Sequence, residues 1–135
     1  MAEKKILLVD DDKDVVHALN VRLRSKGYHV AVAGDAISAV STARKEKPDL
    51  IVLDIGLPGG DGFLVMQRLK SLYELALIPI IVVSAREANA AKEKALGAGA
   101  AAYFQKPVST KEFMLAVEQS LGKVAVEQQT EGFPN

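Results

Sequence analysis

Residues 50–62 read LIVLDIGLPGGDG. Four consecutive apolar residues lead directly into Asp54, and a loop rich in glycine and proline follows. A short, unbroken apolar run that is bounded by turn residues is typical of a parallel strand covered by helices on both faces. The stretch therefore predicts a buried strand that delivers Asp54 to one edge of a sheet.

Similar apolar runs recur along the chain, and segments long enough to form helices separate them. A regular alternation of this kind predicts an α/β fold whose strands all run in the same direction. We expect the strands at residues 6–9, 30–33, 50–53, 80–83 and 101–104.

Local signals mark where the intervening helices begin and end. The first helix is expected from about Lys13 to Gly27, and the second from the N-cap Asp35 to a point before Pro48. The third and fourth are expected at residues 63–72 and 87–96, and a capping-box pattern at residues 109–112 opens the fifth. The first helix places four apolar residues at core spacing: Val15, Ala18, Leu19 and Leu23.

Length and composition narrow the class of protein. The chain has 135 residues, which suits one compact domain, expected at residues 1–122. Residues 123–135 lack apolar periodicity and are expected to form a flexible tail. Basic and acidic residues both number 17, so the overall charge does not favour binding to nucleic acid or anionic lipid. There is no cysteine, and the apolar run near the N-terminus is too short for a signal peptide or membrane span, so we expect a cytoplasmic protein.

Polar side chains occupy the expected carboxyl ends of several strands. These residues are Asp10, Asp11 and Asp12, Asp54, Ser84 and Lys106. Ligands of an open parallel sheet bind beyond this edge. Clustered carboxylates repel one another unless a cation joins them, and an oxygen-only ligand set favours Mg²⁺ or Ca²⁺.

The same set of side chains suits phosphoryl transfer. A carboxylate such as Asp54 can be a covalent nucleophile, Lys106 offers a compact positive charge to a phosphate oxygen, and Ser84 offers a hydroxyl donor. Each residue alone has an ordinary explanation, as a turn residue, a helix cap or a solvated surface side chain. Their joint placement at one edge favours a phosphoacceptor site.

Four segments resemble the receiver domain of two-component response regulators. They are ILLVDDD at residues 6–12, LIVLDIGLPGGDG at 50–62, IIVVSA at 80–85 and YFQKPV at 103–108. The resemblance spans about residues 4–122. It implies a flavodoxin-like, doubly wound (βα)5 fold with a five-stranded parallel sheet in the order 2-1-3-4-5.

The resemblance also implies roles for single residues. Asp54 would accept a phosphoryl group from a phosphohistidine on a sensor histidine kinase or a histidine phosphotransfer protein. Mg²⁺, for which Mn²⁺ could substitute, would be bound directly by Asp11, Asp54 and the backbone carbonyl of Gly56. Asp10 would act indirectly, through water or by orienting its neighbours.

A switch is implied beside the acceptor. Ser84 and Lys106 would contact the phosphoryl group, and the Lys106–Pro107 peptide bond would be cis. Tyr103 would swing inward and change the surface made by the fourth helix, fifth strand and fifth helix. The resemblance implies output through an unknown downstream protein rather than through nucleic acid or a membrane, from a monomer or a weak phosphorylation-dependent dimer.

Alternative functions remain open from sequence. One alternative is a receiver domain excised from a larger regulator or hybrid kinase. Another is an interaction module with a vestigial acidic site, although no residue of the acceptor set is missing. A haloacid-dehalogenase-type phosphohydrolase also uses an aspartate nucleophile, but that class has a second aspartate where this chain has Gly56. We therefore expect self-catalysed phosphotransfer and autodephosphorylation only, and no enzyme turnover.

Overall fold

The computed structural model describes residues 3–57, 61–85 and 88–122. Strands and helices alternate along this part of the chain, as the apolar runs predict. The strands are β1 (Lys5–Val9), β2 (His29–Ala33), β3 (Leu50–Asp54), β4 (Ile80–Ser84) and β5 (Ala102–Gln105). The helices are α1 (Lys13–Ser25), α2 (Ala36–Glu46), α3 (Gly62–Ser71), α4 (Ala88–Gly97) and α5 (Thr110–Ser120).

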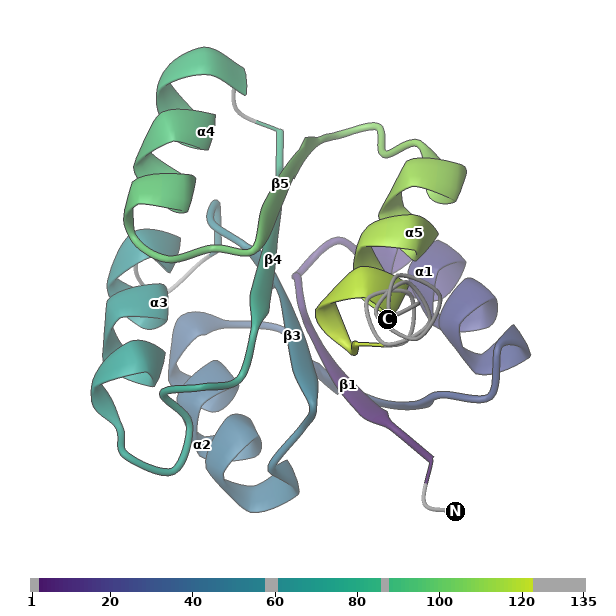
Figure 1. The fold of residues 1–135 in the computed structure, drawn as a ribbon, viewed down its shortest axis with the longest axis horizontal. Coiled ribbons are helices and arrows are strands. Elements are labelled where there is room, and N and C mark those ends of the chain that lie inside the picture. The colour runs from purple at the N-terminus through teal and green to yellow at the C-terminus, as the bar shows by residue number, and fades with distance from the viewer. Residues whose placement is uncertain (1–2, 58–60, 86–87, 123–135) are drawn as a thin grey trace, which may run out of the picture.

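The strands of the described residues form one parallel sheet in the order β2-β1-β3-β4-β5. The predicted doubly wound α/β fold and its strand order are confirmed. Helices α2, α3 and α4 cover one face of the sheet, and α1 and α5 cover the other (Figure 1). The chain places β2 on one side of β1 and β3 on the other side. Folds of this kind bind ligands at the carboxyl ends of the two strands where the chain changes side, which here are β1 and β3.

Side-chain caps explain where several helices begin. Asp35 and Ser109 cap α2 and α5, as predicted, by accepting hydrogen bonds from backbone N–H groups in the first turn. Asp12 and Asp61 cap α1 and α3 in the same way. A cap satisfies N–H groups that have no partner inside the helix, so each of these four helices starts at a defined residue.

Each face of the sheet has its own apolar core. The β3 strand is buried along its whole length and contributes alternate side chains to the two cores. On the α1–α5 side, Phe113 is fully buried and its ring meets Phe104 edge-on, with centroids 6.0 Å apart. Leu19 and Leu23 are buried as predicted, but Ala18 is exposed, because the side of α1 that carries it faces away from the sheet.

Some expectations lie outside the described residues. These are the tail at residues 123–135 and the predicted start of the fourth helix at Glu87. Among the helices that the structure describes, none has both the length and the apolar character needed to cross a membrane.

Candidate functional site

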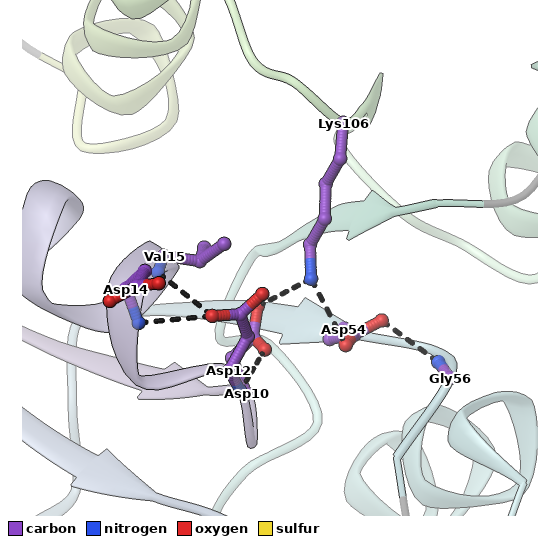
Figure 2. Close-up of polar contacts among 7 residues, drawn as sticks. All are labelled: Asp10, Asp12, Asp14, Val15, Asp54, Gly56 and Lys106. Atoms are coloured by element: carbon purple, nitrogen blue, oxygen red, sulfur yellow. Dashed lines mark hydrogen bonds and ion pairs between the residues drawn. The ribbon is translucent and has the colours of Figure 1, made fainter.

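The carboxyl ends of three strands bring an acidic cluster and a lysine together. Asp10 follows β1, Asp54 is the last residue of β3, and Lys106 follows β5. Figure 2 shows the Lys106 side chain reaching toward both carboxylates. The parallel arrangement explains this meeting, because the carboxyl ends of parallel strands share one edge of the sheet.

Lys106 forms two ion pairs at this edge. Its Nζ lies 3.0 Å from Asp10 Oδ2 and 3.3 Å from Asp54 Oδ2. The three side chains are only 17%, 8% and 7% exposed, in the order Lys106, Asp10, Asp54. Water screens charges poorly at such burial, so these contacts are stronger than surface ion pairs of the same length.

Backbone N–H groups orient the two buried carboxylates. The Gly56 N–H donates to Asp54 Oδ1 at 2.9 Å, and the Asp12 N–H donates to Asp10 Oδ1 at 2.9 Å (Figure 2). Each carboxylate therefore has one oxygen held by a backbone donor and the other held by Lys106. Two fixed contacts leave the carboxylate little freedom to rotate, which presents Asp54 in one orientation.

Burial and neighbouring polar groups shift the pKa values of Asp10 and Lys106. Burial raises the pKa of the Asp10 carboxyl, and hydrogen bonds from the Asp12 N–H and Lys106 offset this only in part. Partial burial lowers the pKa of the Lys106 ammonium, but the hydrogen bond and charge of Asp10, together with the charge of Asp54, outweigh it and raise that pKa overall. The positive charge of Lys106 is thus stabilised by its neighbours, whereas burial destabilises the negative charge of Asp10.

The acidic residues form a set that a cation could bind. One carboxylate oxygen from each of Asp10, Asp11 and Asp54 lies within 4.8 Å of the others. Asp10 and Asp54 are buried, whereas Asp11 is exposed and leaves the cluster open to solvent. Hard oxygen ligands from a small number of protein groups fit Mg²⁺, which keeps several of its own waters or takes phosphate oxygens.

The other predicted site residues lie around this cluster in different ways. Ser84 ends β4 and is buried, and its carbonyl accepts a hydrogen bond from the Lys106 N–H at 2.8 Å. The next peptide bond, Lys106–Pro107, is cis. Tyr103 is half-buried in β5 and packs against the core under α2, α3 and α4 rather than among the acids.

Sequence reasoning missed one close contact beneath the site. Gly62, the first residue of α3, is buried, and its N–H donates to the Ile55 carbonyl at 3.1 Å. A Cβ at residue 62 would lie 2.2 Å from Ile55 Cα, so only glycine fits. In the sequence, the sign of this contact is a glycine directly after the capping residue Asp61. Several other glycines lie nearby, so the sequence does not indicate which of them is in close contact.

The chain is similar in sequence and in structure to known receiver domains. Residues 6–118 match the family model of the response regulator receiver domain. A Chloroflexus aurantiacus protein assigned as a response regulator is 31% identical over 90% of this chain and 99% of its own, with a TM-score of 0.85. A CheY-like receiver domain protein of Methanospirillum hungatei is 28% identical over 97% and 100%, with a TM-score of 0.82.

A third similar structure holds a metal. The receiver domain of a sensor histidine kinase from Pseudomonas aeruginosa is 30% identical over 90% of this chain and 99% of its own, with a TM-score of 0.81. That domain has a magnesium ion coordinated in its active-site cleft.

Proposed function

Because the chain belongs to the response regulator receiver domain family of two-component signal transduction, we propose that it is a phosphorylation-activated switch whose acceptor is Asp54. One observation carries the choice of residue. Asp54 is a buried carboxylate that is oriented by the Gly56 N–H and lies 3.3 Å from the Lys106 ammonium. Asp10 makes similar contacts with Lys106 and a backbone N–H, but the segment that resembles the phosphoacceptor strand of receiver domains is residues 50–62, which contains Asp54 and not Asp10.

The proposed reaction transfers a phosphoryl group from a phosphohistidine. An Asp54 carboxylate oxygen attacks phosphorus, the P–N bond breaks, and the leaving imidazole nitrogen keeps the electron pair and takes a proton from solvent. Lys106 then exchanges part of its contact with the carboxylates for a phosphoryl oxygen, because that group carries more negative charge. The product is an aspartyl phosphate, which stores the signal until autodephosphorylation removes it.

Divalent metal completes the proposed site. Asp11, Asp54 and the Gly56 carbonyl would bind Mg²⁺ directly, or Mn²⁺ in its place, and Asp10 would act indirectly by holding Lys106 and its neighbours. The metal would neutralise charge on the transferring phosphoryl group. The support is the three-carboxylate cluster of this chain and the magnesium ion of the Pseudomonas receiver domain.

The proposed output is a change in packing near β5. Phosphorylation would draw Ser84 and Lys106 toward the new group and favour an inward Tyr103, which shifts the population of two packings. The affected surface is made by α4, β5 and α5, where Leu96 and Leu115 are 42% and 48% exposed. A downstream protein would bind there, from a monomer or a weak phosphorylation-dependent dimer.

The proposed setting is a cytoplasmic phosphorelay. The donor would be a sensor histidine kinase or a histidine phosphotransfer protein, and neither nucleic acid nor a membrane would be a direct partner. The same module could act alone or within a larger regulator or hybrid kinase.

Labelling with acetyl phosphate and Mg²⁺ tests the proposal. We expect one phosphoryl group per chain by intact mass, no label in Asp54→Asn, and normal label in the exposed control Asp14→Asn. Continuous turnover of acetyl phosphate at a constant rate would instead indicate a hydrolase. Label that persists in Asp54→Asn, or no label in the unmodified chain, would refute Asp54 as the acceptor.

A further inference from the structure

A groove of about 410 Å³ runs between α2 and α3, and its lining residues belong neither to the acidic cluster nor to the α4–β5–α5 surface. Its lining residues include Ile37, Val40 and Arg44 from α2 and Asp61, Leu64 and Arg68 from the α3 side. Its volume is within the range of roughly 300–1,000 Å³ that is usual for ligand pockets.

The two helices present matching faces to this groove. Ile37, Val40 and Arg44 are spaced by three and four residues, and Leu64 and Arg68 by four, so each set shares one side of its helix. Both helices follow strands of the same parallel sheet and therefore run in the same direction. The apolar side chains thus lie near the start of both helices. Arg44 and Arg68 both lie in the last turns.

Two apolar side chains of the groove, one on each helix, are exposed. Ile37 is 80% exposed and Leu64 is 63% exposed, although both face a concave surface. A single exposed apolar residue is normal, but exposed residues on both walls of one groove indicate a surface that is covered by something else. Neither side chain belongs to the cores of the described residues, so the core does not account for them.

Charge divides the groove into two ends. Arg44 Nε pairs with Glu74 Oε2 at 3.4 Å, which leaves its terminal nitrogens as donors. Arg68 makes no ion pair with any residue that the structure describes. At the opposite end, the Asp61 carboxylate accepts from the Phe63 N–H at 2.8 Å and is occupied by its capping role. The end of the groove formed by the last turns of α2 and α3 is therefore positively charged, and its arginines have N–H groups available to bind a partner.

We propose that the α2–α3 groove binds an amphipathic helical segment of a partner protein that carries acidic residues one to two turns from an apolar pair. The apolar pair would lie between Ile37 and Leu64, and the acidic side chains would reach Arg44 and Arg68. This is a helix-in-groove mode of recognition. Binding does not require phosphorylation of Asp54, so this proposal stands apart from the proposed switch.

The apolar part of the groove favours a peptide over nucleic acid. A nucleic-acid surface would be a broad basic stripe, whereas this chain has no formal net charge and the groove has only two arginines beside exposed isoleucine and leucine. Phosphate alone would leave Ile37 and Leu64 in water.

A designed probe peptide tests the groove directly. The probe is a fluorescein-labelled, alanine-based helix of about 16 residues, with two leucines one turn apart and two glutamates in the following turns. We expect it to shift backbone amide signals of α2 and α3 in spectra of the ¹⁵N-labelled chain. Leu64→Ala and Arg68→Glu should each weaken binding about fivefold to tenfold. Val21→Ala, at an exposed position of α1, is the matched control and should leave binding unchanged.

Charge reversal gives the decisive comparison. A probe with lysines in place of the glutamates should bind poorly to the unmodified chain and regain affinity for the Arg44→Glu, Arg68→Glu double variant. The proposal is overturned if the lysine probe binds equally well, if the shifts fall outside α2 and α3, or if no binding occurs. Concentration-dependent shifts of α2 and α3 without any peptide would also overturn it, because a second copy of the chain would then be the occupant.

Discussion

Gly62→Ala is expected to destabilise the fold although alanine favours helices. The added Cβ would lie 2.2 Å from Ile55 Cα and 2.7 Å from both the carbonyl carbon and oxygen of Ile55. Ordinary carbon contacts are about 3.5–4.0 Å, so backbone would have to move by more than 1 Å. The Gly62 N–H also donates to the Ile55 carbonyl at 3.1 Å, which ties the two segments together and opposes that movement.

The magnitude follows from two opposing effects at Gly62. Overpacking a tight site costs about 1–3 kcal/mol, and the upper value applies because the atoms met are backbone rather than a flexible side chain. Alanine returns about 1 kcal/mol through its helix propensity. The free energy of unfolding should therefore fall by about 2 kcal/mol, which corresponds to a drop in Tm of roughly 6–10 °C for a domain of this size.

Gly97→Ala is the matched control. Gly97 is the last residue of α4, and a Cβ there would meet no heavy atom within 4 Å. It should leave stability unchanged or raise it by up to about 1 kcal/mol. Urea titration followed by far-UV circular dichroism measures both variants. Equal stability of Gly62→Ala and Gly97→Ala would refute the packing argument.

The same variant tests the link from packing to the site. Ile55 follows Asp54 directly, and Asp54 is oriented by the Gly56 N–H on the other side of Ile55. A shift of Ile55 would disturb this orientation, so Gly62→Ala should take up label from acetyl phosphate more slowly than Gly97→Ala. Equal labelling rates would show that the site tolerates the movement.

Three further measurements follow from the structure. Phe113→Ala should lower the free energy of unfolding by about 3–5 kcal/mol in urea titration, because the ring is fully buried against Phe104. Leu115 is 48% exposed, so Leu115→Ala should change the same free energy by less than about 0.5 kcal/mol. A similar loss in both variants would contradict the assigned core. Lys106→Ala should still allow phosphorylation of Asp54 but uncouple it from the change at Tyr103, and an unaltered phosphorylation-dependent tyrosine spectrum would disprove that role. The N–H groups of α2 that Asp35 caps lower the pKa of its carboxyl. Its contribution to stability is thus fully present above the ordinary value of 3.8 and is lost as the pH falls through the lower folded value, so Asp35→Ala should reduce the acid dependence of Tm.

Local signals account for most of what could be predicted. The apolar runs place all the strands that the structure describes to within one residue at either end, and Asp35 and Ser109 begin helices where their capping chemistry favours a start. The placement of Asp10, Asp54 and Lys106 at one edge was predictable too, because the carboxyl ends of parallel strands share that edge.

The exposure of single side chains and the contacts between distant residues depend on tertiary packing and could not be predicted from local sequence signals. Ala18 has the spacing of a core residue, but it lies on a side of α1 that the rest of the fold leaves exposed. The direct contact of Lys106 with Asp10 depends on how far a long side chain reaches across the sheet, which no spacing in the sequence states.

The sequence by itself determined the fold class and the acidic site beside Asp54, because periodicity and strand-end chemistry act over a few residues. Only the tertiary structure decided the close approach of Gly62 to Ile55 and the groove that joins Ile37 with Leu64. Both features bring together atoms from separate elements, and their distances depend on how each helix packs on the sheet.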